Sequence, residues 1–428
     1  MDQKGAVFAA CGILALFYLF RSPPEFASPS VSLPHCPSPR TFGELTDYNY
    51  FVFIGTKHGD SSVIQNLCYF LGLKYNKTFA VNIEHPVNFY GLSSAFLDSS
   101  YVQGTPRAPS LICAEMDYDE GNMERILEAR FVGEKKVVVG FVRDPQEMFL
   151  SCLLRITLYK RSNSDRSVSM LLDQNVMNYI TKVEELAQGN SKSDHITLSP
   201  HACNNQLAFS LGLSSSDYRP GGIYDGRRAI DAADLFAMTT KQRVSDFVVH
   251  ERMTESLFML KEKYCLYPEE DFTTLSRLAE SYVGIGLGEL SDSTKDRLRH
   301  FLRYDYAIYN SILASNQQKF EYLISDWETH ARYEHFLRAQ RSFAERCSST
   351  RLSLVPREAA IRAYELTREG RADMQCSLVN ENTRLLANMI YQMQSKNLTG
   401  TVSAMIAQDK PYNSLLQSVA DSLDLSDK

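Results

Sequence analysis

The chain has 428 residues, of which 44% are hydrophobic and 22% charged, and its formal net charge is −6. This composition is typical of a globular protein with enough apolar mass for one large domain and smaller parts. The negative charge argues against a protein that binds nucleic acid through bulk positive charge, although it allows a local basic pocket. We therefore expect no nucleic-acid partner.

An apolar run near the start of the chain predicts a membrane anchor. Lys4 precedes an uncharged, mostly apolar stretch over residues 5–20, which Arg21 ends. A helix of this length spans roughly 24 Å, slightly less than the ~30 Å hydrocarbon core of a bilayer. The sequence lacks a small-residue cleavage signal at the expected place, which favours an uncleaved signal anchor over a cleaved signal peptide. We predict a short cytoplasmic tail over residues 1–4 and a transmembrane helix over residues 5–21.

The next segment and two sequons also indicate a lumenal protein. Six prolines fall within residues 22–40, which predicts an extended stem over residues 22–46. Asn76-Lys77-Thr78 and Asn397-Leu398-Thr399 are acceptor sequences for N-glycosylation. Some of the nine cysteines would pair in an oxidising lumen, but their connectivity does not follow from spacing. Clustered Cys/His spacing typical of zinc sites is missing from the sequence, so we expect no metal.

From about Asp47, short β-rich runs alternate with helical patterns. We predict strands over residues 50–54, 110–113, 136–142 and 246–250, and helices over residues 61–72, 121–131, 146–160, 168–188 and 228–244. Near-continuous apolar strands, such as residues 137–142, are typical of a sheet covered on both faces. The alternation predicts an α/β fold with a doubly wound parallel sheet and helices on both faces.

After Ser291 the sequence reads as helix throughout. Residues 293–313 predict one helix with Ser293 as its cap, and a charged helical pattern continues from about Lys319, broken at Pro356. We therefore expect the α/β domain to cover residues 47–325 and a helical C-terminal extension to cover residues 326–428.

The loop after the first predicted strand, GTKHGDSS at residues 55–62, has the composition of an anion-binding loop. Gly59 lets the backbone turn so that several N–H groups face one point. Lys57 adds a full charge, Ser61 and Ser62 add hydroxyl donors, and the next helix adds the positive end of its dipole. The spacing differs from the nucleotide P-loop, and an ordinary strand-to-helix turn is the alternative.

A second candidate anion site follows the strand at residues 136–142. Arg143 ends this strand, Pro145 suits the first position of a helix, and Ser151 comes about two turns later. An arginine at the carboxyl end of a strand and a serine on the next helix can hold one phosphate from two sides. The alternative is a surface pair of Arg143 with Asp144 and a serine that packs within the helix.

Together the two motifs resemble the donor site of sulfotransferases, and more of the chain resembles the galactose-3-O-sulfotransferases, which include the enzyme that sulfates galactosylceramide. The family's first loop reads approximately His-Lys-Thr-Gly-Ser-Ser-Thr, where this chain has Thr56-Lys57-His58-Gly59-Asp60-Ser61-Ser62. Its Leu-Arg-Glu-Pro and Phe-Glu-Ser elements are matched at residues 142–145 and 149–151. Further similar segments are residues 204–213, 246–260 and 302–312, so the likeness covers about residues 47–323.

The resemblance implies a P-loop-like sulfotransferase fold and 3′-phosphoadenosine 5′-phosphosulfate as co-substrate. The first loop would hold the 5′-phosphosulfate, and Arg143 and Ser151 the 3′-phosphate; the loop residues concerned are Thr56, Lys57, His58, Gly59, Ser61 and Ser62. The implied acceptor is a hydroxyl of galactose, the 3-hydroxyl by analogy, on a glycolipid or glycan. The implied location is the Golgi membrane, in a single-pass type II orientation with a lumenal catalytic domain.

Sulfuryl transfer needs charge neutralisation at the leaving oxygen and a base for the acceptor proton. Lys57 suits the first role. For the base we expect His58, Glu84 or His85, and Glu251 is a further candidate that could instead be structural or bind the acceptor.

The chain departs from the family at three places. Thr56 replaces a histidine, Asp60 replaces a serine, and Glu115-Met116-Asp117 replaces His-Met-Arg. A carboxylate about 4 Å from a sulfate costs roughly 1 kcal/mol in water and several times more in a partly dry pocket. The chain is thus either a divergent enzyme or a catalytically inert relative that acts as a binding or scaffold module. A P-loop-type kinase or nucleotidase is disfavoured because a Gly-Lys-Ser/Thr loop is missing.

Overall fold

The computed structural model describes residues 39–55, 62–80, 88–89, 110–116, 135–160, 172–187, 203, 206–211, 244–274, 290–354, 362–380 and 383–424. Residues 37–428 belong to one compact unit. The predicted tail, the predicted transmembrane helix and most of the predicted stem lie outside the described residues. Among the helices that are described, none combines the length and apolarity needed to cross a membrane.

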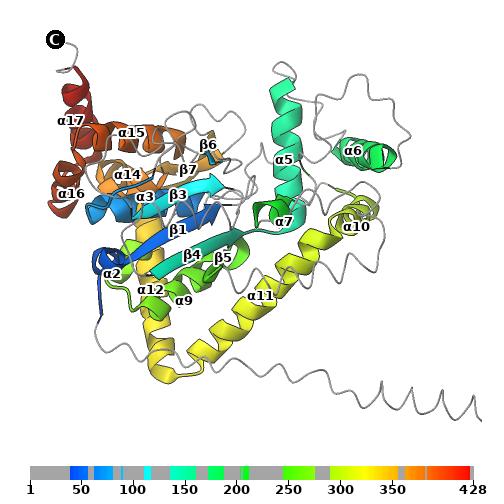
Figure 1. Ribbon diagram of the computed structural model, residues 1–428, viewed down its shortest axis with the longest axis horizontal. Helices are drawn as coiled ribbons and strands as arrows, with labels where there is room; N and C mark the ends of the chain where they lie inside the picture. Colours follow the sequence, from blue (N-terminus) through cyan, green and yellow to red (C-terminus); the bar gives the residue numbers. More distant parts are fainter. Residues whose placement is uncertain are drawn as a thin grey trace, which may run out of the picture. The chain divides into compact units, whose positions relative to one another are not determined.

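A parallel sheet of five strands forms the centre of this unit (Figure 1). Its order is β2-β3-β1-β4-β5, and every neighbouring pair is parallel. The strands are β1 (Asn49–Gly55), β2 (Asn88–Phe89), β3 (Leu111–Met116), β4 (Lys135–Val142) and β5 (Asp246–Val249). The four predicted strands are confirmed, and their apolar side chains are buried as expected, with Val52, Ile112 and Val138 fully inaccessible.

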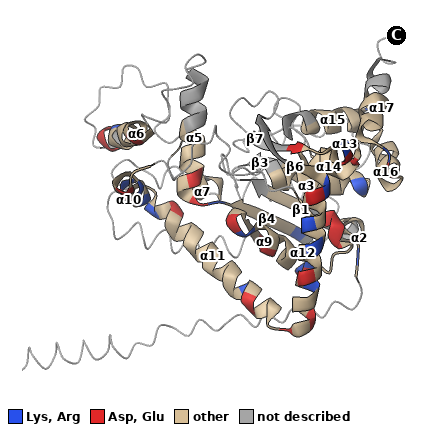
Figure 2. Ribbon diagram, turned by 180° about the vertical axis from the view of Figure 1, so that it is seen from behind, with Lys and Arg blue, Asp and Glu red and all other residues tan. Residues whose placement is uncertain are grey.

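Helices surround the sheet, which confirms the predicted α/β class. Those between and beside the strands are α2 (Phe42–Tyr48), α3 (Ser62–Lys74), α5 (Pro145–Lys160), α6 (Leu172–Ala187), α7 (Gln206–Ser210) and α9 (Met253–Tyr264). In Figures 1 and 2, α3 and α9 lie on opposite sides of the sheet. The predicted helices over residues 61–72, 146–160 and 168–188 are confirmed, with ends that differ by at most four residues. The helix predicted over residues 121–131 lies outside the described residues, as does the one predicted over residues 228–244 except for its last residue.

The single helix predicted over residues 293–313 is wrong. The chain instead forms α10 (Asp292–Phe301) and α11 (Arg303–Ile324), which are separated at Leu302. The cap is Ser291, not Ser293, because its Oγ accepts the N–H of Thr294 at 3.4 Å. Leu302 is 1% exposed and belongs to a buried cluster that also includes residues of α6 and α10. Packing against α6 therefore sets the direction of α10, and the helical pattern of the sequence contains no sign of this break.

The C-terminal region is also more complex than the predicted helical extension. After α12 (Trp327–Cys347) comes an antiparallel hairpin of β6 (Ser348–Leu354) and β7 (Arg362–Leu366). The helices that follow are α13 (Arg368–Ala372), α14 (Met374–Asn380), α15 (Thr383–Ser395), α16 (Thr399–Ala407) and α17 (Tyr412–Asp424).

These last helices pack against α3 rather than forming a separate appendage. The side chain of Asn66 on α3 donates to the carbonyl oxygen of Val379 at 3.1 Å. The buried amide of Gln394 accepts the N–H of Phe79 at 2.6 Å and donates to its carbonyl oxygen at 3.1 Å. α14, α15 and α16 thus complete the layer around α3.

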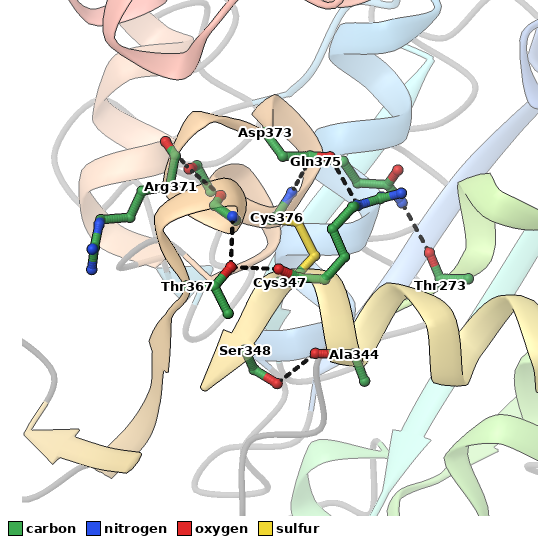
Figure 3. The surroundings of a disulfide bond; sticks show 12 residues. Thr273, Ala344, Cys347, Ser348, Thr367, Arg371, Asp373, Gln375 and Cys376 are labelled. Carbon is green, nitrogen blue, oxygen red and sulfur yellow. Dashed lines mark hydrogen bonds and ion pairs between the residues drawn. A yellow bond between two sulfur atoms is a disulfide. The ribbon is translucent and has the colours of Figure 1, made fainter. Parts of the chain in front are cut away.

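A disulfide between Cys347 and Cys376 joins the end of α12 to α14 (Figure 3). The N–H of Thr367 donates to the carbonyl oxygen of Cys347 at 2.9 Å, and the Thr367 hydroxyl accepts the N–H of Gly370 at 2.8 Å. A Cβ at Gly370 would lie 2.3 Å from the Cys347 carbonyl oxygen, which is far inside van der Waals contact. Only glycine therefore fits at residue 370.

We predict that Gly370→Ala lowers the free energy of unfolding by about 1–3 kcal/mol, because backbone atoms would have to shift. Gly400→Ala is the matched control, since its Cβ would have no heavy-atom neighbour nearer than 3.8 Å. Urea denaturation of both variants measures the difference. Equal stabilities of the two variants would contradict the close packing at Gly370.

Two further disulfides hold the elements around the sheet, Cys68–Cys113 between α3 and β3, and Cys152–Cys203 between α5 and the segment before α7. Cys265 is also disulfide-bonded. Among the described residues, seven cysteines are thus disulfide-bonded.

The start of the described chain is tied to the segment after α9. The backbone of Arg40 donates to the carbonyl oxygen of Cys265 and accepts the N–H of Tyr267, both at 2.9 Å.

Candidate functional site

The carboxyl ends of β1 and β4 lie side by side at the middle of the sheet. Gly55, the last residue of β1, is in register with Phe141 of β4. After β1 the chain continues toward β2 and β3, and after β4 it continues toward β5 on the other side. In open α/β sheets, ligands bind outside the carboxyl ends of the strands where the order reverses in this way. We call this place the switch-point edge.

Elements next to both predicted anion-binding motifs lie at the switch-point edge. The first loop lies outside the described residues, including Thr56, Lys57, His58, Gly59, Asp60 and Ser61, but its two flanking elements are described. β1 ends at Gly55 and α3 begins at Ser62, so the loop starts and ends at this edge. The second motif begins directly after β4, at Arg143.

Arg143 is buried and ion-paired. Its side chain is only 2% exposed, and its Nη2 lies 3.1 Å from Oε2 of Glu147. Arg143 is therefore not at the surface, and Glu147 supplies a carboxylate partner that the sequence analysis did not predict. Ser151 is buried as well, on α5. Because Glu147 and Ser151 are four residues apart, they share one face of α5. The carboxylate that pairs with Arg143 is therefore on the face of α5 that carries Ser151.

Asp144 caps α5. Its Oδ1 accepts the N–H of Gln146 at 2.8 Å and that of Glu147 at 3.2 Å, which satisfies two N–H groups of the first turn. Pro145 occupies the first helical position, as predicted. The Tyr306 hydroxyl donates to the same carboxylate at 3.1 Å. Two N–H groups in the first turn of α5 are thus already hydrogen-bonded to the Asp144 carboxylate.

Glu251 connects three elements. It lies in the short 3-10 helix η5 (His250–Arg252) that follows β5. Its Oε1 accepts the N–H of Asp144 at 2.8 Å, and its Oε2 accepts the hydroxyl of Tyr309 on α11 at 2.8 Å. Both carboxylate oxygens therefore make structural hydrogen bonds, which favours the structural alternative for Glu251 over a role as base.

Three carboxylates and one arginine meet in this region: Asp144, Glu147, Glu251 and Arg143. Burial raises the pKa of Asp144, against the hydrogen bonds from Glu147, Tyr306 and Gln146. Burial also raises the pKa of Glu147, and the charge of Arg143 partly opposes this shift. A phosphate beside Arg143 would meet a net negative surrounding from these four groups, and loss of the Glu147 charge by protonation would make it less negative.

Asp305 joins α11 to another segment that carried the family resemblance. It is fully buried, and its Oδ1 and Oδ2 accept the N–H groups of Ala208 and Leu207 at 3.0 and 3.3 Å. Burial raises the pKa of Asp305 to about 7. The segments around Arg143, Leu207, Glu251 and Asp305 are thus brought into contact, although they are far apart in the sequence.

Sequence reasoning missed Glu147, Tyr306, Tyr309 and Asp305 as parts of this arrangement. The four-residue spacing from Arg143 was an available signal for Glu147. The two tyrosines, three residues apart on a helix, could equally have been core residues. Burial raises the pKa of both hydroxyl groups, and the Asp144 and Glu251 carboxylates raise them further.

Two of the predicted base candidates, Glu84 and His85, lie outside the described residues, as does His58. Glu115 is in register with Gly55 and with Asn88, so its backbone belongs to the switch-point edge. In the described parts of the chain, His, Cys, Asp and Glu side chains form no group of three or more that could hold a metal ion.

Comparison of the chain with protein-family models, curated proteins and solved structures finds no match. A functional assignment therefore depends on the residues themselves and on their arrangement.

Proposed function

We propose that the chain is a Golgi carbohydrate sulfotransferase. It transfers a sulfuryl group from 3′-phosphoadenosine 5′-phosphosulfate to a hydroxyl of galactose, the 3-hydroxyl by resemblance, on a glycolipid or glycan. The observation that carries the proposal is the strand order, because it puts the end of β1, the start of α3 and Arg143 at one switch point. A donor with phosphate groups at both ends needs two anion-binding elements at one edge.

Each motif has a role toward one end of the donor. Lys57, the loop N–H groups and the N-terminus of α3 suit the 5′-phosphosulfate. Thr56, His58, Gly59, Ser61 and Ser62 complete this loop. Arg143 and Ser151 suit the 3′-phosphate, since a guanidinium can donate two parallel hydrogen bonds to one phosphate. To bind the 3′-phosphate, the Arg143 guanidinium has to contact the phosphate together with Glu147 or release Glu147.

The proposed reaction is an in-line transfer. The acceptor oxygen forms a bond to sulfur while the bond between sulfur and the bridging phosphate oxygen breaks, and the proton of the acceptor hydroxyl passes to a base. Catalysis comes from positioning and from neutralising the leaving oxygen, which is the role of Lys57. His58, Glu84 and His85 are the proposed bases, because both oxygens of Glu251 already accept hydrogen bonds.

The disulfides support the proposed compartment. Cys68–Cys113, Cys152–Cys203 and Cys347–Cys376 are formed, and Cys265 is bonded too. Disulfides persist in oxidising compartments such as the secretory pathway and are rare in the cytosol. A lumenal domain behind a type II membrane anchor fits this chemistry.

A catalytically inert relative that acts as a binding or scaffold module is the second candidate. It is favoured by the ion pair of Glu147 with buried Arg143, and by two more carboxylates next to it. The departures at Thr56, Asp60 and Glu115 point the same way. In this case the chain would keep the fold but bind the donor weakly or not at all.

A sulfate-transfer assay decides between the candidates. The full chain is incubated with 3′-phosphoadenosine 5′-phosphosulfate and either galactosylceramide or galactose-terminated glycans, and sulfated product is measured. Product formation that Lys57→Ala abolishes, with the fold intact by circular dichroism, supports the enzyme. Donor binding without product from any galactoside contradicts the enzyme and supports the inert relative.

A further inference from the structure

The two N-glycosylation sequons are neighbours in the fold, although they are far apart in the sequence. A Cβ at Gly400 would lie 3.8 Å from Nδ2 and 3.9 Å from Oδ1 of Asn76. Gly400 is only three residues after Asn397. The Ser403 hydroxyl, in the middle of α16, donates to the carbonyl oxygen of Lys74 at 2.7 Å, which holds α16 against the end of α3.

Both asparagines have the same local structure. Each ends a helix in the left-handed backbone region, with φ of 51° at Asn76 and 56° at Asn397. In each case the next N–H bonds back to the last turn: Lys77 to the Gly72 carbonyl at 2.8 Å, and Leu398 to the Met393 carbonyl at 2.7 Å. This is a common helix-ending arrangement, in which the left-handed position is usually glycine and sometimes asparagine. It accounts for each asparagine but not for the threonine two residues later.

Both side chains are exposed, so an enzyme can reach them. The sequons also lie away from the switch-point edge. α3 begins at that edge with Ser62 and has 13 residues, so its end is about 20 Å away, toward the amino ends of the strands. In Figures 1 and 2, α16 lies beside α3, and α5 lies at the other end of the sheet.

We infer that Asn76 and Asn397 are both N-glycosylated and that their glycans cover one surface, at the ends of α3 and α15 and the start of α16. The donor is an oligosaccharide linked to a lipid diphosphate. The Asn Nδ2 forms a bond to the anomeric carbon, the bond between that carbon and the diphosphate oxygen breaks, and the amide loses one proton. The surface so covered is distant from the switch-point edge, which stays open to an acceptor. This inference needs a lumenal location and does not depend on sulfotransferase activity.

Glycan occupancy is measured by intact mass of the full chain expressed in a eukaryotic cell, before and after treatment with a peptide N-glycosidase. Thr78→Ala and Thr399→Ala remove each sequon but keep the helix-ending asparagine. Thr78→Ser and Thr399→Ser are matched controls that keep the sequon. We expect two glycans on the wild type and on both serine variants, one on each alanine variant, and none on the double alanine variant. A wild type with one glycan or none overturns the inference.

Lysine labelling tests whether the glycans share one surface. Lys396 is exposed next to Asn397, whereas Lys182 is exposed on α6. We expect removal of the glycans from the folded protein to raise labelling of Lys396 several-fold in both single alanine variants, because either glycan shields it. Labelling of Lys182 should not change. Unchanged labelling of Lys396 in Thr399→Ala, where only Asn76 carries a glycan, overturns the shared surface.

Discussion

Replacing Arg143 with alanine is expected to weaken binding of 3′-phosphoadenosine 5′-phosphate by at least about thirtyfold. Loss of one partner of a buried, hydrogen-bonded charge pair costs about 2–5 kcal/mol, and about 1.4 kcal/mol corresponds to a factor of ten. Arg143 is 2% exposed at the end of β4, so a phosphate held there would be largely desolvated. Isothermal titration calorimetry of the folded variant measures the change.

Two comparisons make the Arg143 result specific. Arg143→Lys keeps the charge but loses the planar fork, so it should bind more weakly than wild type and more tightly than the alanine variant. Arg338→Ala removes an exposed arginine of α12 and should leave binding unchanged. A folded Arg143→Ala variant with wild-type affinity would remove Arg143 from the proposed donor site.

Glu147→Gln is expected to tighten the same binding by a few-fold to about tenfold, because the carboxylate that pairs with Arg143 no longer competes with the phosphate. Since burial raises the pKa of Glu147, protonation should give wild type the same gain as the pH falls. Glu345→Gln on the exposed face of α12 is the control. Weaker or unchanged binding in Glu147→Gln would mean that the Arg143–Glu147 pair is purely structural.

Asp305 is expected to make the protein less stable as the pH rises from about 4 to about 7. Burial raises the pKa of its carboxyl in the folded state to about 7, against an ordinary value of 3.8. The folded protein therefore holds this proton at pH values where the unfolded chain has lost it, and stability is highest at the low end of this window. One pKa unit corresponds to about 1.4 kcal/mol, so the loss is at most roughly 4 kcal/mol.

Asp305→Asn removes this titration, so the difference in free energy of unfolding between wild type and variant should change by a few kcal/mol between pH 5 and pH 8. The difference isolates Asp305 from half-buried carboxyl groups such as Asp144 and Glu147. Parallel pH profiles of wild type and Asp305→Asn, from urea denaturation, would contradict the assigned shift.

The parts of the fold that the sequence predicted correctly are those fixed by local pattern. β1, β3, β4 and β5 are short apolar runs because the sheet is covered by helices, and α5 begins where Pro145 follows a capping aspartate. The break at Leu302 and the β6–β7 hairpin follow from packing between distant segments, and a helical pattern does not contain that information. The same holds for the disulfide pairs.

The sequence predicted the two motifs of the candidate site but not the side chains that surround them. Arg143 and Ser151 lie where the motif puts them, at the end of β4 and two turns along α5. The carboxylate of Glu251 and the hydroxyls of Tyr306 and Tyr309 come from η5 and α11, more than one hundred residues later. Only the fold shows that a phosphate at Arg143 would share its surroundings with three carboxylates.

The central claim is that the switch-point edge binds a nucleotide with a 3′-phosphate. The most direct measurement is a thermal unfolding titration of the full chain with 3′-phosphoadenosine 5′-phosphate and, in parallel, with ATP. At 100 times the dissociation constant a ligand adds about 2.7 kcal/mol to the free energy of unfolding, which raises the melting temperature measurably. We expect this rise with the bisphosphate and a much smaller one with ATP. No rise with the bisphosphate from a folded sample, or an equal rise with both nucleotides, would contradict the proposed donor site.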